Sequence, residues 1–126
     1  MTRQPAGDGL LRPIFDVSED IRYVALKRGA ELIQQQRPGV ADASASESDR
    51  YEELFVNPGL LSLARARGDL DCGGLHYLII RYGNFFQIVC PLEAGHVSVC
   101  VGKDGDPERL VAPILAACAT VCRKLG

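Results

Sequence analysis

The sequence has no tryptophan, one methionine and two histidines, and aromatic residues make up only 6% of its 126 residues. It also has little net charge, since 14 basic and 16 acidic side chains leave −2 at pH 7. This balance gives no general attraction to phosphate backbones or anionic lipids, so we expect neither nucleic acid nor a membrane as a partner. At 47% hydrophobic, the chain is too apolar for a disordered protein. Its length predicts a single domain.

Long apolar runs are absent as well. The most apolar stretch, residues 111–121, is interrupted by Pro113 and is far shorter than the roughly 20 residues that a membrane span needs. The first thirteen residues contain two arginines and an aspartate but no apolar segment of the kind found in signal peptides. We therefore expect a cytoplasmic protein.

The cysteines do not form a recognisable metal or redox motif. They are odd in number and contain no C-x-x-C pair: Cys72, Cys90, Cys100, Cys118 and Cys122. A zinc site needs about four ligands, and only His76 and His96 are present to supplement the thiols. Neither histidine stands beside a nucleophile pattern, so we expect both at the surface or at a sheet edge. We predict reduced, mostly buried thiols, no metal, no cofactor and no enzymatic activity.

The N-terminal third is predicted to hold an arm and then a hairpin. Residues 1–17 show no sustained period and are interpreted as a loosely ordered arm with one apolar anchor, which precedes a single domain over 18–126. In residues 21–36, β-formers flank Gly29, which favours a hairpin with its turn at that glycine. A serine followed by two acids just before this segment also resembles a helix start, so a helix is the alternative. Residues 37–48 are rich in small residues and are predicted to be a loop.

A helical pattern follows this loop. Asp49 and Glu52 have the spacing of a capping box, which predicts that a helix begins there. Pro58 disfavours helical geometry at the residue before it, so the helix should break or kink there. Asn57 is a good N-cap, which predicts a second helix that Gly68 ends.

Three strands and a final helix are predicted for the C-terminal half. Residues 75–82, 85–92 and 96–102 are β-forming runs separated by short connections that contain glycine, as in an antiparallel meander. The first two runs are apolar on both faces, as expected for strands covered twice, whereas the third has valines alternating with more polar residues. Pro107 follows a capping aspartate and opens a helix with an aliphatic stripe.

The run LHYLIIRYGNFFQIVCPLEAGHVSVCVG, followed by that helix, resembles the roadblock/LC7 family. The resemblance covers about residues 20–120 and depends on element order rather than on an invariant motif. It implies an α+β, profilin-like fold with a five-stranded antiparallel sheet and flanking helices, in the order β-β-α-β-β-β-α. Family members usually begin with an amphipathic helix, which the seventeen-residue arm is too short and irregular to supply.

The resemblance implies a non-enzymatic module that dimerises and regulates other proteins, often small Ras-like GTPases in bacteria. An apolar strand left at a sheet edge is an aggregation hazard unless it pairs, and pairing of residues 75–82 with their copy around a twofold axis would remove it. The family arrangement places the dimer interface on the helices over 49–67 and on that strand. The candidate interface residues are Tyr51, Leu54, Phe55, Leu61, Arg65, Tyr77, Ile79 and Arg81.

Two other functions remain open from the sequence. A sensor of small ligands, of the PAS or GAF kind, would need an apolar pocket between sheet and helix of several hundred cubic ångströms, on the order of known ligand sites. A thiol-based enzyme, using Cys118 and Cys122 or Cys72, would need an exposed thiol with a lowered pKa.

Overall fold

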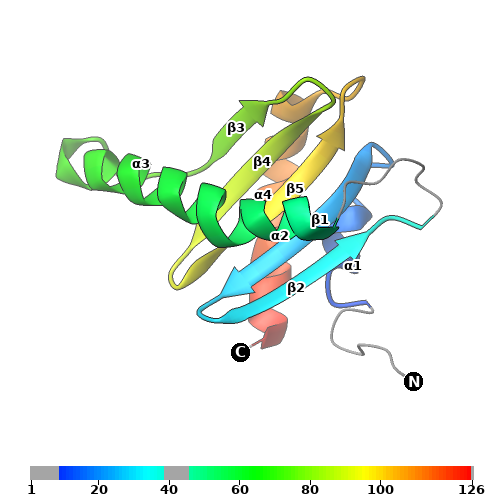
Figure 1. Cartoon of the computed structure of the whole chain (residues 1–126), viewed down its shortest axis with the longest axis horizontal. Helices are drawn as coiled ribbons and strands as arrows, with labels where there is room; N and C mark the ends of the chain where they lie inside the picture. Colours follow the sequence, from blue (N-terminus) through cyan, green and yellow to red (C-terminus); the bar gives the residue numbers. More distant parts are fainter. Residues whose placement is uncertain (1–8, 39–45, 126) are drawn as a thin grey trace.

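The computed structural model describes residues 9–38 and 46–125 and forms one five-stranded sheet (Figure 1). Its strands run antiparallel to their neighbours in the order β2-β1-β5-β4-β3. Their bounds are β1 Ile21–Arg28, β2 Glu31–Gln36, β3 Leu78–Arg81, β4 Phe85–Leu92 and β5 Gly95–Gly102. The predicted α+β class is thus confirmed, as is the hairpin in preference to a helix over residues 21–36. Residues 1–8 of the predicted arm and 39–45 of the predicted loop lie outside the described residues.

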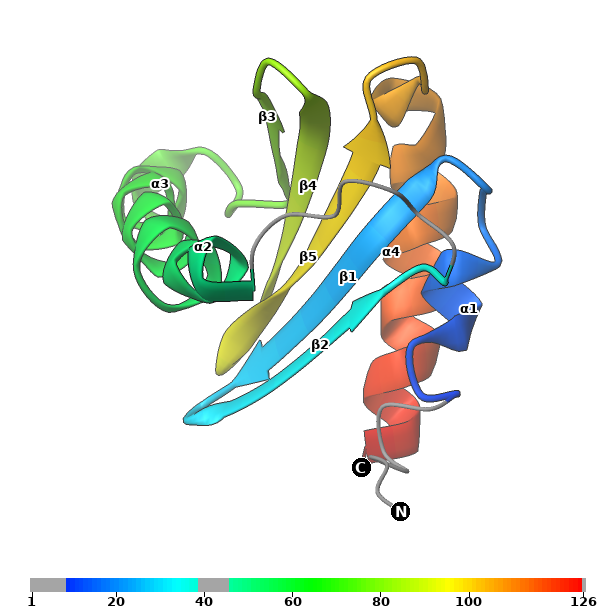
Figure 2. The same cartoon turned by 45° about the vertical axis from the view of Figure 1, so that its right-hand side comes forward.

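Helices cover both faces of the sheet. Figure 2 shows α2 and α3 on one side of the strands, and α4 with α1 on the other. The helices are α1 Arg12–Phe15, α2 Ser46–Tyr51, α3 Asn57–Asp71 and α4 Pro107–Leu125, and a π-helical turn, η1 Glu52–Val56, joins α2 to α3. Among the described residues, none of the helices has both the length and the hydropathy that a bilayer crossing demands.

The apolar core lies between the sheet and α4. The valines of β5 point to this face and are fully buried, as the alternation in that strand predicted. Leu11 and Ile14 of the N-terminal segment and Ile114 of α4 are also fully buried in the same cluster. At about 25 cal/mol per Å² of apolar surface, this layer supplies most of the hydrophobic stabilisation of the fold.

The helix was predicted to break or kink at Pro58, and it does not break, because it passes the proline through a π-helical turn. The N–H of Asn57 donates to the carbonyl of Glu52, five residues back, and both residues that cap η1 have helical backbone angles. The extra residue in this turn lets the chain continue past a proline, which would strain a regular α-helix. The helix also begins at Ser46 rather than at a cap on Asp49, so Asp49 lies within it.

Gly68 does not end the helix, although this was predicted. It is buried inside α3, and a Cβ there would lie 3.2 Å from the backbone nitrogen of Leu75. The chain leaves the helix after Asp71 through Gly73 and Gly74, which both have positive φ, and then crosses back over Gly68. Gly68 is therefore required by close packing of two backbones, and the two later glycines make the turn.

The first strand of the meander is shorter than the predicted 75–82. Only Leu78–Arg81 pair with β4, so β3 is a four-residue strand at the edge of the sheet. Its residues are half-buried or exposed, whereas the central residues of β4 are buried. Of the two strands predicted to be covered on both faces, β4 is covered in this way and β3 is not.

Candidate interaction surface and the polar layer beneath it

Exposed apolar side chains gather along the helical segment from α2 to α3 and the loop after it. Tyr51 and Phe55 are 61% and 62% exposed, and their rings make a tilted contact with centroids 5.2 Å apart. Leu63 and Leu70 are 75% and 78% exposed, and Tyr77 is exposed as well. Single exposed apolar residues are common, but the large exposed ones in the described part of the chain all lie between residues 51 and 77. Such a concentration is typical of a protein-interaction surface.

Some of the predicted interface residues are exposed, and others make contacts within the chain. Tyr51, Phe55, Tyr77 and Arg81 are exposed, and Leu54 is half-buried. The Arg81 guanidinium lies 4.7 Å from the centroid of the Phe86 ring and also donates to backbone carbonyls of the following turn.

The other three predicted residues make contacts within the chain. Leu61 is only 3% exposed and therefore packs inside the molecule. Arg65 donates a hydrogen bond to the carbonyl of Leu92, which holds α3 against the β4–β5 hairpin. Ile79 is half-buried and packs against the apolar core.

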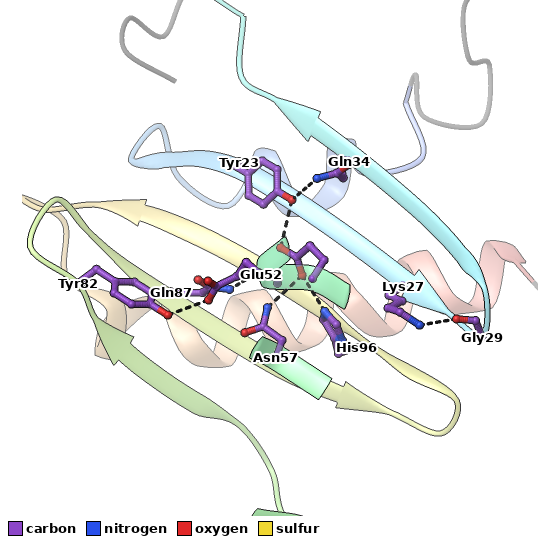
Figure 3. Close-up of polar contacts among 11 residues, drawn as sticks. Tyr23, Lys27, Gly29, Gln34, Glu52, Asn57, Tyr82, Gln87 and His96 are labelled. Carbon is purple, nitrogen blue, oxygen red and sulfur yellow. Dashed lines mark hydrogen bonds and ion pairs between the residues drawn. The ribbon is translucent and has the colours of Figure 1, made fainter. Parts of the chain in front are cut away.

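Beneath the helical surface lies a buried carboxylate that the sequence analysis did not identify. Glu53, in the π-helical turn, is fully buried and makes hydrogen bonds to three side chains. These partners, Tyr23, Asn57 and His96, are labelled in Figure 3. Tyr23 Oη donates to its Oε2 at 3.1 Å, and Asn57 Nδ2 donates to its Oε1 at 3.0 Å. His96 Nε2 lies 2.7 Å from the same Oε1. A buried carboxylate is tolerated only when it is paired and hydrogen-bonded in this way.

Other polar groups extend the Glu53 cluster into a polar layer over the same face of the sheet. Gln34 donates to the hydroxyl of Tyr23 at 3.0 Å, and Gln87 Nε2 donates to Ser98 Oγ at 2.7 Å. The buried hydroxyl of Tyr23 has a pKa well above its ordinary value, because burial and the charge of Glu53 both disfavour the phenolate.

His96 was expected at the surface or at a sheet edge, and this prediction is wrong. It is 1% exposed, because it belongs to the polar face of the central strand β5 and meets Glu53 there. His76, by contrast, is exposed as expected. The alternation of polar residues in β5 was the available signal, since a polar face on a central strand implies polar partners above it.

A cavity of about 240 Å³ lies beside this layer, between the α2–η1 segment and the β3–β4 turn. Tyr82 Oη donates to Glu52 Oε2 at 2.9 Å within its lining (Figure 3). Burial raises the pKa of Glu52, and the charges of Glu53 and Asp49 raise it further. With three carboxylates in its lining, the cavity does not suit the apolar ligand that a PAS-like or GAF-like sensor would require.

The cysteines are free thiols in the structure. Cys90 and Cys118 are buried, Cys100 and Cys122 are half-buried, and Cys72 is exposed. Of the candidate thiols, Cys118 has a pKa raised by its hydrogen bond with Cys90 and by burial, which is the opposite of what activates a nucleophile.

No family model matches the sequence, and no curated protein matches it. Solved structures, however, match its fold over nearly the whole chain. The gliding protein MglB of Thermus thermophilus superposes with a TM-score of 0.71 at 8% identity, covering 98% of this chain and 93% of that one. A roadblock/LC7 domain from Streptomyces avermitilis gives 0.67 at 17% identity, covering 94% and 96%. MglC of Myxococcus xanthus gives 0.62 at 9% identity, covering 91% and 95%. The fold is thus that of roadblock/LC7 domains.

Proposed function

We propose that this roadblock/LC7-like domain is a non-enzymatic, homodimeric protein-interaction module that regulates a small Ras-like GTPase or a related signalling complex. The observation that carries the proposal is the exposed apolar surface from Tyr51 to Tyr77, which lies on α2, η1, α3 and the loop leading to β3. Leaving that much apolar surface in water is unfavourable, and a second copy of the chain would cover it.

The edge of the sheet supports the same assembly. Strand β3 occupies one end of the sheet, so its outer backbone groups have no strand beside them within the described chain. Two copies that meet at β3 around a twofold axis would join their sheets into one of ten strands and satisfy those groups. One of the structurally similar proteins is an MglB with a tetrameric arrangement, at a TM-score of 0.72 and 7% identity.

A GTPase-related partner is proposed from the fold and its neighbours. Two of the matched proteins, MglB and MglC, share this fold, and MglB is a gliding protein. Purified small Ras-like GTPases, loaded with GDP or with a non-hydrolysable GTP analogue, would be mixed with the chain and their complexes measured by light scattering. Complex formation that depends on the bound nucleotide is the expected result.

The dimer is tested first, by the mass of the purified protein in light scattering. We expect twice the chain mass of 13.6 kDa for the wild type and a folded monomer for Leu63→Asp. Leu63 suits this test better than the half-buried Ile79, because a charge at 75% exposure leaves folding intact. Ala119→Asp, on the exposed side of α4, is the matched control and should remain dimeric. A monomeric wild type would overturn the proposal.

A further inference from the structure

The cavity beside the polar layer has the charge and shape of a receptor for one cationic side chain. Its lining includes the carboxylates of Asp49, Glu52 and Glu53 and the rings of Tyr82 and Phe85. No lysine, arginine or histidine lines it among the described residues. The lining of this cavity is therefore acidic, with aromatic groups in its wall.

Several groups in the lining respond to those carboxylates. Beyond the effect of burial, the charges of Glu53, Asp49 and Glu52 raise the pKa of the Cys100 thiol, and Arg22 only partly opposes them. Burial, the hydrogen bond to Glu52 and the charge of Glu52 raise the pKa of Tyr82 to about 12. A cation in the cavity would relieve this concentration of negative charge.

A second observation is independent of the carboxylates. Gln87 lines the cavity and is 1% exposed, and its Nε2 donates a hydrogen bond to Ser98 Oγ at 2.7 Å. Its amide oxygen has no hydrogen-bond donor among the described residues. Glu52, Tyr82 and Gln87 come from η1, the β3–β4 turn and β4, and Figure 3 shows the three together. Because Gln87 lines the cavity, this oxygen is available to a donor that enters from outside.

The size and lining of the cavity favour a guanidinium group. About 240 Å³ is below the roughly 300–1,000 Å³ of pockets for whole small molecules, so a single side chain fits better than a cofactor. A guanidinium is planar, lies flat on aromatic rings and presents several N–H donors at once. Those donors would serve Glu52 and the oxygen of Gln87 together, while its face contacts the Tyr82–Phe85 pair, whose centroids are 5.2 Å apart.

We propose that this cavity receives the guanidinium of an arginine side chain carried by a protein partner. The proposal rests on the proposed function, since the arginine would belong to the regulated protein, which would dock beside the apolar surface that the second copy covers. The cavity is continuous with that surface along the chain: Ser48 and Glu52 line it, and Tyr51 and Phe55 on the same helical segment are exposed.

The test uses N-acetyl-arginine amide as the probe and amide NMR signals of Gly83 and Asn84, which line the cavity, as reporters. We expect saturable shifts with a dissociation constant in the millimolar range, and at least tenfold weaker binding of N-acetyl-citrulline amide, which has the same shape without the charge. Equal binding of the two probes would overturn the proposal, as would tighter binding of N-acetyl-lysine amide. A dissociation constant below about 10 μM for the arginine probe would identify a free guanidinium compound as the ligand. It would overturn the proposal that the ligand is a side chain of a protein partner.

Variants locate the site and separate this proposal from the dimer. Glu52→Gln should weaken binding of the arginine probe at least tenfold, whereas Glu108→Gln, on the exposed first turn of α4, should not change it. If Glu52→Gln bound the arginine probe as tightly as the wild type does, the assignment of the binding site to this cavity would be overturned. Light scattering of Glu52→Gln should still give a dimer. A monomeric wild type that binds the probe would contradict the dimer alone, and a dimer that does not bind it would contradict the cavity alone.

Discussion

The two faces of the sheet are built from opposite chemistry. The face under α4 is aliphatic, and its fully buried residues include Val24, Leu26, Ile88, Val97 and Val99. The face under η1 and α3 is polar, and its residues with 5% exposure or less include Tyr23, Gln87, His96 and Ser98. Because the same strands supply both sets, neighbouring residues in one strand face different chemistry.

The two faces therefore contribute differently to the fold: one provides stability, and the other fixes the position of a helix. Apolar contacts are strong in sum but have little directional preference, so the α4 face provides stability. Hydrogen bonds to Glu53 form only when the π-helical turn lies directly over Tyr23 and His96. We infer that the polar face fixes where the helix lies, and with it the exposed apolar surface that the helix carries.

The largest expected effect comes from the aliphatic face. Ile114→Ala removes a fully buried side chain and leaves a cavity, which should lower the free energy of unfolding by about 2–5 kcal/mol. Urea denaturation followed by circular dichroism measures this loss. Ala119→Ser, at an exposed position of α4, is the control and should change stability by no more than about 0.5 kcal/mol. A loss below about 1 kcal/mol for Ile114→Ala would show that α4 is not the main stabilising layer.

A smaller but coupled effect is expected on the polar face. Glu53→Gln keeps the volume but removes the charge that accepts from His96 and Asn57, and should cost about 2 kcal/mol. In a double-mutant cycle, Glu53→Gln and His96→Leu should be coupled by more than about 1 kcal/mol. The pair Ile114→Ala and His96→Leu, on opposite faces, should be additive within about 0.5 kcal/mol. Additivity of the first pair would mean that the polar layer does not act as a unit.

The fold was predictable because its signals are local. Alternation in residues 96–102 and the glycines between strands defined the meander, and Gly29 defined the first hairpin. The π-helical turn was not predictable, since a proline taken by itself favours a break in the helix before it. The hydrogen bonds of Glu53 outweigh this local preference. Two of its partners, Tyr23 and His96, lie on strands that are far from it in the sequence.

The sequence could not show which of the candidate interface residues are exposed. Tyr51 and Phe55 were named as interface candidates because the resemblance places the interface on the helices over 49–67, and the structure has both side chains exposed. Leu61 was named on the same ground, but it is only 3% exposed, and its burial depends on the packing beneath the helix. The cavity was not predictable, because Glu52, Tyr82 and Gln87 come together only after the sheet forms.

The smallest expected effect separates Glu52 from its neighbour Glu53. In the fold the pKa of Glu52 is raised, so its ionised form is less favourable there than in the unfolded chain. The carboxylate therefore lowers stability as pH rises above its unfolded value of about 4.3, and the full effect is present above the folded value. Glu52→Gln should increase stability at pH 7, by less than about 1 kcal/mol because solvent screens the partly exposed group.

At pH 4 and below, this stabilising effect of Glu52→Gln should largely disappear, because the wild-type carboxyl is then mostly protonated in both states. Urea denaturation of both proteins at pH 4, 5.5 and 7 measures the trend. Glu53→Gln, which removes a satisfied carboxylate, should instead be destabilising at pH 7, so the two adjacent substitutions should have opposite signs there. A loss of stability in Glu52→Gln at pH 7 would show that the cavity carboxylate is compensated within the chain, which would remove the electrostatic reason for an arginine to enter.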